Sequence, residues 1–244
     1  MRHMSPMICA ISICLIVLSS TAWAGDAPGT WKDKAELAYV DTSGNTEVTT
    51  LSAKNHLSYQ FTDQIKGLWK VEVLNGESDG ERNAESYFTE LRGDYAYSDL
   101  LYHYANASWL KDRFIDVDSR TVLGAGSGYK FLTGAKHFLV GEAGLTYTME
   151  EFTDDSDDQY VGGRLFGQYD YQLNESTRFT QSVEGLFDLE QLDNYRLNTE
   201  TALITAINSV LSFKTSYVIK YDNDPALGTE HTDTILAASL VANF

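Results

Sequence analysis

Polar and apolar residues alternate strictly along much of this chain, and the pattern is clearest between Val48 and Leu74. In the runs 51–61 and 65–73, every odd-numbered residue is uncharged, whereas the even-numbered positions include lysine, histidine and glutamate. Successive side chains of a β-strand point to opposite faces, so a period of two indicates strands. The short turn 62–64 joins the two runs, and the whole stretch is predicted to form a β-hairpin.

Twelve segments of this kind follow one another from Trp31 to the C-terminus. They span about residues 31–40, 48–61, 65–74, 86–97, 100–111, 119–131, 137–149, 160–173, 177–187, 194–207, 210–221 and 232–244. In nine of them, the second to fourth and the sixth to eleventh, every Lys, Arg, Asp and Glu occupies an even-numbered position. The fifth segment has no clear apolar face. The sixth places Gly124, Gly126 and Gly128 on its polar face, where glycines relieve curvature or make room for a neighbouring side chain.

Strands with one uncharged face fit either a soluble β-sandwich or a transmembrane β-barrel. The segments run about 10–14 residues, which is longer than the five or six usual in globular sheets and enough to cross a bilayer at a tilt. Aromatic residues collect at the ends of the uncharged faces, as they do at lipid–water interfaces; Tyr95 and Tyr147 are examples from the two rims. We therefore predict an all-β fold, a closed antiparallel transmembrane barrel of about 12 strands in an up-and-down meander.

The connections between the predicted strands alternate between long and short, as in outer-membrane barrels with short periplasmic turns and longer outer loops. The predicted long connections are 41–47, 75–85, 112–118, 150–159, 188–193 and 222–231. They hold 21 of the 35 acidic residues and only two basic ones, Arg82 and Arg113, for a net charge of −19. Nearly all of the net charge is therefore expected at one end of the barrel, facing the cell exterior.

The first 24 residues are predicted to be a secretory signal peptide. Arg2 precedes an apolar run, 7–18, which is followed by the small-residue cleavage site Ala22-Trp23-Ala24. The run is too short for a spanning helix, and the pattern around its cysteines is unlike that of a lipoprotein. Residues 25–30 then form a short periplasmic N-terminus, and residues 31–244 form the barrel as one domain.

Composition narrows the chemistry that the chain can carry. Both cysteines fall in the predicted signal peptide, so the mature chain is expected to contain no disulfide. Its net charge of −18 argues against a nucleic-acid partner, because phosphate binding needs a basic face. The acidic run 150–158 could attract Ca²⁺ or Mg²⁺, but it lacks the glycine turn and ligand spacing of an EF-hand loop. We expect no metal site and no cofactor.

An enzyme would need a nucleophile beside a base. His56 lies two residues from Ser58 and four from Ser52 on one strand face, which leaves an outer-membrane hydrolase as an alternative. A lone lumenal histidine is more often a polar filler, and no catalytic residue is predicted.

Charges converge only on the even-numbered face, which is expected to line the lumen. The predicted lumen-lining residues are Lys54, Lys70, Glu72, Glu90, Arg92, Asp94, Arg120, Glu142, Arg164, Asp170, Arg178, Glu184, Arg196, Glu200 and Lys214. Barrels of about eight strands are filled and those of 16–18 hold aqueous channels, so a barrel of twelve lies between. The set therefore either lines a narrow channel for small hydrophilic solutes or cations, or cross-links a filled interior in a structural or osmotic-stress protein.

Several local sequences resemble one family. They are Trp31, the turn Thr42-Ser43-Gly44-Asn45-Thr46, the stretches 111–114, 124–129 and 221–225, and the terminal Phe244. Together they are similar to the YdiY-like family of salt-induced outer-membrane proteins, over essentially the whole of 31–244. The resemblance implies a bacterial outer-membrane β-barrel without an assigned biochemical role, and it carries over no catalytic or binding residue.

The closing strand, with Leu236, Leu240 and Phe244 on one face, is similar to the signal that the barrel-assembly machinery reads. The alternative is a plain lipid-facing residue at the strand end. We expect a monomer of the Gram-negative outer membrane whose partners are lipid, lipopolysaccharide and, during biogenesis, that machinery.

Overall fold

The structure is a computed structural model that describes residues 27–43, 49–78, 81–112, 117–154, 156–225 and 230–244. The predicted signal peptide, 1–24, lies outside these residues. Within the described part of the chain, no helix has the length and apolar character needed to cross a bilayer.

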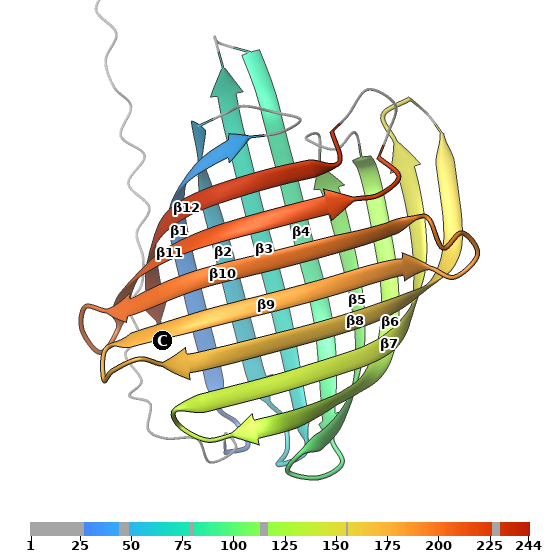
Figure 1. The fold of residues 1–244 in the computed structure, drawn as a ribbon. Coiled ribbons are helices and arrows are strands. Elements are labelled where there is room, and N and C mark those ends of the chain that lie inside the picture. The colour runs from blue at the N-terminus through green and yellow to red at the C-terminus, as the bar shows by residue number, and fades with distance from the viewer. Residues whose placement is uncertain (1–26, 44–48, 79–80, 113–116, 155, 226–229) are drawn as a thin grey trace, which may run out of the picture.

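Twelve strands form one closed antiparallel barrel in which every strand pairs with its neighbours in sequence (Figure 1). The strands are β1 (Trp31–Ser43), β2 (Thr49–Gln60), β3 (Ile65–Ser78), β4 (Glu81–Ala96), β5 (Leu101–Asp112), β6 (Val117–Thr133), β7 (His137–Phe152), β8 (Asp157–Gln172), β9 (Thr177–Asp188), β10 (Tyr195–Ala206), β11 (Leu211–Asp222) and β12 (Thr232–Asn243). In Figure 1 the front strands β9–β11 cross the back strands β2–β5 obliquely, as tilted strands of a barrel do. The predicted fold is confirmed.

The first and last strands close the barrel. Ala35 lies opposite Ala242 and Leu37 opposite Leu240 in the β1–β12 ladder. The backbone of Phe244 continues this ladder, since its N–H donates to the carbonyl of Asp33 at 2.8 Å and its carbonyl accepts from the N–H of Asp33 at 3.0 Å. Closure leaves no open strand edge, which is what a hydrocarbon environment requires.

Large apolar side chains lie on the outer surface. Leu37, Leu145 and Leu165 are 65%, 62% and 55% exposed, whereas their ionisable neighbours Glu36 and Glu142 are buried. A soluble β-sandwich would bury these leucines between its sheets, so that alternative is wrong. The outward apolar wall is the surface that a bilayer would cover.

The fifth segment, whose lipid face the sequence did not define, has its even-numbered residues inside. Tyr104 is buried and Trp109 is exposed, in the same sense as in the neighbouring strands. The inward glycines of β6 make room for β5, because a Cβ on Gly128 would collide with Tyr102 and one on Gly126 with Tyr104.

We expect Gly126→Ala to lower the free energy of unfolding by about 1–3 kcal/mol, the usual cost of overpacking. The new Cβ would approach Gly144 Cα at 2.7 Å and the Tyr104 ring at 2.8 Å, and it would also meet the Ala143 carbonyl oxygen, so the backbone itself would have to move. Equilibrium unfolding in urea from lipid vesicles measures the change. Gly93→Ala is the matched control, since nothing lies within 4 Å of its added Cβ, and equal effects of the two variants would contradict this account.

The predicted alternation of long and short connections is wrong for three of the long ones, of which 112–118 is reduced to the residues between Asp112 of β5 and Val117 of β6. Strand β3 runs to Ser78 and β4 begins at Glu81, with Glu77 opposite Arg82, so ladder pairing takes up most of 75–85. Strands β7 and β8 likewise extend into 150–159. The polar sequences at this end pair with each other instead of looping, because antiparallel hydrogen bonding continues beyond the apolar band. The connections from an odd-numbered strand to the next even-numbered one, such as β1–β2 and β3–β4, all lie at one end of the barrel, which we call the acidic end. The opposite end, which carries the connections such as β2–β3, is called the short-turn end.

Candidate functional site in the barrel interior

The inward face of the barrel carries two ion-pair networks that reach across the bore. The first is centred on Glu142 of β7. Arg92 of β4 donates to both Glu142 oxygens, at 3.1 and 2.7 Å, and to Asp94 at 2.7 Å. Arg164 of β8 donates to Glu142 and to Glu184, each at 2.7 Å. Because β4 and β7 are not neighbours, the Arg92–Glu142 pair passes through the lumen and not along the wall.

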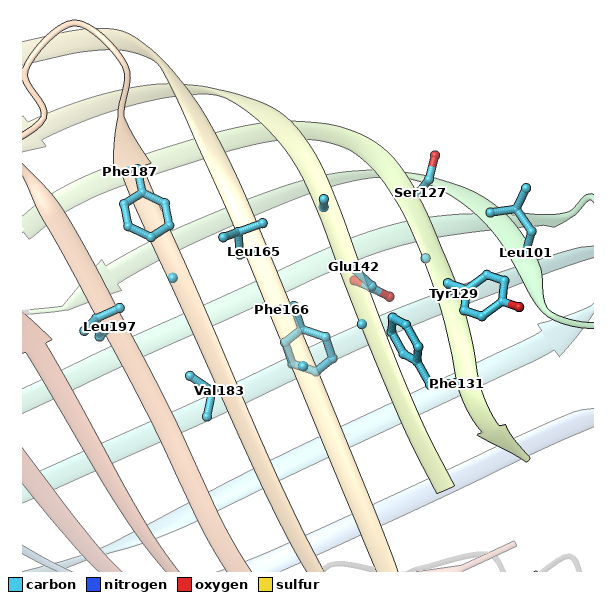
Figure 2. A pocket seen from close by; sticks show the side chains of 15 residues that line it. Leu101, Ser127, Tyr129, Phe131, Glu142, Leu165, Phe166, Val183, Phe187 and Leu197 are labelled. Carbon is cyan, nitrogen blue, oxygen red and sulfur yellow. The ribbon is translucent and has the colours of Figure 1, made fainter. Parts of the chain in front are cut away.

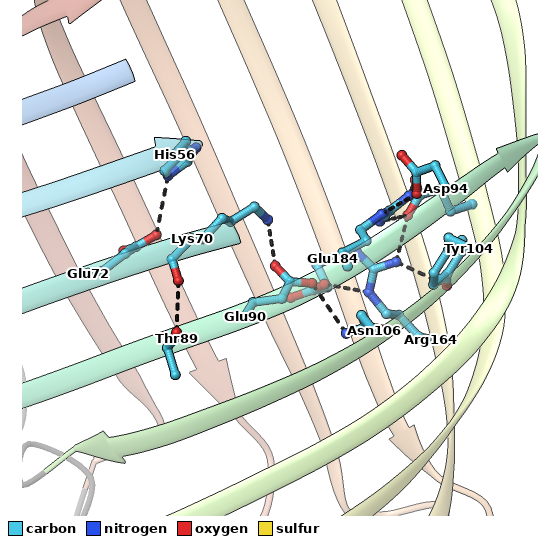
Figure 3. A network of polar contacts seen from close by, with 12 residues as sticks. His56, Lys70, Glu72, Thr89, Glu90, Asp94, Tyr104, Asn106, Arg164 and Glu184 are labelled. Carbon is cyan, nitrogen blue, oxygen red and sulfur yellow. Dashed lines mark hydrogen bonds and ion pairs between the residues drawn. The ribbon is translucent and has the colours of Figure 1, made fainter. Parts of the chain in front are cut away.

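Two tyrosines of β5 complete this first network. The Tyr102 hydroxyl donates to Glu142 at 2.5 Å, and the Tyr104 hydroxyl accepts from Arg164 at 3.1 Å. The Tyr104 ring packs against two guanidinium groups, with centroid distances of 4.3 Å to Arg92 and 5.5 Å to Arg164. Figure 3 shows Tyr104, Arg164, Glu184 and Asp94 converging inside the wall. The cations are thus held by both carboxylates and aromatic faces.

The second network lies toward the acidic end and is centred on Glu150 of β7. Arg196 of β10 donates to the two Glu150 oxygens at 2.8 and 3.1 Å, to Asp222 at 2.9 Å and to the Tyr160 hydroxyl at 2.9 Å. Arg120 of β6 also pairs with Glu150. The Arg196–Glu150 contact joins strands three places apart, so it too crosses the interior.

One further ion pair spans the whole barrel. Lys220 of β11 lies 3.3 Å from Asp112 of β5, which also accepts a hydrogen bond from Ser86 at 3.1 Å. These two strands are six places apart in a ring of twelve, so they belong to opposite walls. The interior at this level is therefore bridged from side to side.

Three inward ionisable side chains, on β2, β3 and β10, are partly exposed. Lys54 pairs with Glu72 at 3.0 Å, and Lys214 pairs with Glu200 at 2.7 Å. The side chains of Lys54, Glu72 and Glu200 keep 28%, 34% and 33% of their exposure, against 4% for Glu142. Space for solvent therefore borders these three side chains, whereas Glu142, at the centre of the first network, is almost completely buried, as are Lys214 and Glu36 on the same wall as the three.

The structure joins thirteen of the fifteen predicted lumen-lining residues in ion pairs. These are Lys54, Lys70, Glu72, Glu90, Arg92, Asp94, Arg120, Glu142, Arg164, Glu184, Arg196, Glu200 and Lys214. Asp170 instead accepts hydrogen bonds from Gln168 at 3.1 and 3.2 Å. Arg178 has no ion pair within the described residues.

Sequence reasoning missed several members of the site. Asp112, Glu150 and Asp222 were assigned to loops, although they continue the even-numbered pattern of their strands. Glu36 lies in the first segment, where an aspartate on the odd-numbered face interrupts the alternation of charge. Glu36 accepts a hydrogen bond from Lys214 at 3.2 Å. The tyrosines of β5 carried no charge signal.

The histidine considered for a hydrolase faces a carboxylate. His56 Nε2 lies 3.9 Å from Glu72, and among the described residues no hydrogen bond joins His56 to Ser52 or Ser58. In the described residues there is also no group of three or more potential metal ligands.

A shallow apolar depression of about 570 Å³ lies on the outer wall over β5–β10 (Figure 2). Gly141, Gly167 and Gly185 line it together with exposed residues such as Leu165 and Val183. It faces the side that a bilayer would cover, so lipid chains are its expected contents.

A closed twelve-stranded barrel with an apolar exterior and an ionised interior places the chain in the class of outer-membrane β-barrels. Three solved structures share the fold at 7% identity. The NanC porin superposes with a TM-score of 0.60 over 85% of this chain and 98% of that one. The translocator domain of the autotransporter NalP from Neisseria meningitidis gives 0.55 over 90% and 89%, and a bacterial polysaccharide outer membrane secretin gives 0.51 over 90% and 100%.

The chain belongs to the family described as protein of unknown function DUF481, which matches residues 35–244. The uncharacterized protein YdiY of Escherichia coli (strain K12) is 32% identical over 203 residues, which cover 83% of this chain and 79% of that protein. The resemblance to the YdiY-like family is thus confirmed.

Proposed function

We propose that this chain is an outer-membrane barrel with a narrow aqueous passage for small hydrophilic solutes or cations. The observation that supports this function is the exposure of Lys54, Glu72 and Glu200, about a third of each side chain, in mid-barrel. Each residue lies at least five positions from either end of its strand. Because the outer wall is apolar, water would reach these groups through the lumen.

The passage would run past the three partly exposed side chains, Lys54, Glu72 and Glu200. On the opposite side, Glu142 and Glu150 are almost completely buried in their arginine pairs. These crossing pairs restrict the bore, so the solutes would be small.

The acidic end would favour cations. Its connections and adjoining strand ends hold 21 acidic residues and two basic ones. One of them, Asp154, accepts hydrogen bonds from the hydroxyl and the N–H of Ser156, which hold the pKa of that carboxyl below its ordinary value and keep it ionised. A concentrated negative field raises the local concentration of cations at the mouth.

Planar-bilayer recording tests the passage. We expect small conductance steps from the purified protein and, in a KCl gradient, a reversal potential that favours cations. Glu72→Gln should shift that potential toward anions, because it leaves Lys54 without its carboxylate partner in the lumen. The matched control is Glu175→Gln in the exposed β8–β9 connection, which should leave the potential unchanged. A wild-type protein that inserts but gives no steps would exclude the passage.

A second candidate function is a sealed structural barrel that answers osmotic stress without transport. The pairs that cross the bore, Arg92–Glu142 and Lys220–Asp112, favour it. This function predicts that the correctly folded protein inserts into planar bilayers without producing conductance steps.

The remaining assignments are also proposals. The barrel would be a monomer without enzymatic activity and would contact outer-membrane lipid and lipopolysaccharide. Its N-terminal signal peptide would direct its export. Phe244, at the closing seam, would be the residue that the barrel-assembly machinery reads.

A further inference from the structure

Arg178 differs from the other inward arginines of the described structure. Arg92, Arg164 and Arg196 each pair with two carboxylates, and Arg120 pairs with Glu150. Among the described residues Arg178 pairs with no carboxylate, and its buried Nε has no hydrogen-bond partner. An unsatisfied buried donor costs free energy, and in a native structure it calls for an explanation such as a missing ligand.

A second cation lies in the same part of the interior. Lys34 of β1 also has no ion pair in the part of the chain that the structure describes, and it is electrostatically coupled to Arg178, Lys214, Glu36 and Glu200. Both carboxylates already contact Lys214, at 3.2 and 2.7 Å. Neither Lys34 nor Arg178 therefore has a carboxylate of its own among the described residues.

None of the neighbouring polar side chains in the described residues forms an ion pair with Arg178 or Lys34. Glu36 is engaged further by the hydroxyl of Ser239 at 2.8 Å. Asp170 lies on the neighbouring strand β8, two residues from the position opposite Arg178. It accepts hydrogen bonds from Gln168 and lies beyond ion-pair distance of the guanidinium. The residue directly opposite Arg178 on β8 is the neutral Gln172.

The two cations that lack an ion pair lie near one mouth of the barrel. Arg178 is the second residue of β9 and Lys34 the fourth of β1, so both lie near the short-turn end. The acidic connections are at the other end, and their field would be weak here because ionic screening acts over about 10 Å.

We propose that Lys34 and Arg178 bind the acid group of an anionic solute, a carboxylate or a phosphate, at the short-turn mouth of the lumen. A guanidinium offers paired donors to such a group, and the lysine adds a point charge. The anion would give the two cations a charged partner. This inference rests on the proposed passage, because the solute would reach the site through water in the lumen.

Inorganic phosphate is the probe, measured by the ³¹P transverse relaxation of phosphate titrated with purified protein in detergent at constant ionic strength. We expect saturable broadening with the wild-type protein, and displacement of phosphate by acetate. Arg178→Gln and Lys34→Gln should each weaken phosphate binding about tenfold, which corresponds to about 1.4 kcal/mol. Heat-modifiable migration on gels checks that both variants fold.

Lys136→Gln is the control, because it removes one positive charge at the same end from the exposed β6–β7 connection. Phosphate binding that is absent, unchanged in the two lumen variants, or weakened equally in the control would overturn the site. Phosphate binding without bilayer conductance would support the anion site and exclude the passage. Conductance without phosphate binding would support the passage and exclude the anion site.

Discussion

Replacing Leu145 with arginine is expected to cost about 2–4 kcal/mol of folding free energy in a bilayer, the range for a lipid-facing arginine at the midplane of a barrel. Leu145 is 62% exposed and sits midway along β7, with at least seven residues on either side of it in the strand. In water an exposed leucine can usually be replaced by arginine at little cost. A large penalty would therefore identify the solvent outside the wall as hydrocarbon.

The measurement is equilibrium unfolding in denaturant from phospholipid vesicles, compared with the same substitution at Leu192. Leu192 is 73% exposed but lies in the connection between β9 and β10, where the charge would remain in water. We expect a change below about 0.5 kcal/mol for Leu192→Arg, as for most surface positions. If both variants are equally tolerated, the outer wall does not face lipid.

The alternation of charge was sufficient to predict the barrel, because a wall between lipid and water imposes one rule on every residue of a strand. It failed at β5, where the inward face carries Tyr102 and Tyr104 in place of charges. These rings fit only because β6 supplies glycines opposite them, and that dependence on another strand is not visible within the segment itself.

The partners within the site were harder to predict than its members. Arg92 and Glu142 both occupy even-numbered positions, which predicts that they lie on the same face of the sheet. The strand tilt and stagger that bring these side chains of β4 and β7 together across the bore cannot be read from the sequence. The same holds for Lys220 and Asp112 on opposite walls. Asp112, Glu150 and Asp222 were missed because acidic residues at strand ends look like loops when pairing beyond the apolar band is ignored.

Glu142→Gln is expected to be a strongly destabilising conservative change in the interior. The glutamate is 4% exposed and accepts hydrogen bonds from Arg92, Arg164 and Tyr102. Removing one partner of a buried ion pair typically costs about 3–5 kcal/mol, because the remaining charge is left uncompensated. Asp94 and Glu184 still hold the two arginines, so we expect a loss near the lower limit, about 3 kcal/mol.

Glu72→Gln makes the same chemical change where solvent reaches the pair, since Glu72 is 34% exposed. Its effect on unfolding should stay below about 1 kcal/mol, as for solvated ion pairs. Denaturant unfolding from vesicles gives both values, and bilayer recording on the same samples adds a second readout: loss of the Arg92–Glu142 bridge should enlarge any conductance step. Equal stability losses would mean that Glu72 is no better solvated than Glu142. That difference in exposure is the basis on which the proposed passage is placed beside Glu72 and not beside Glu142.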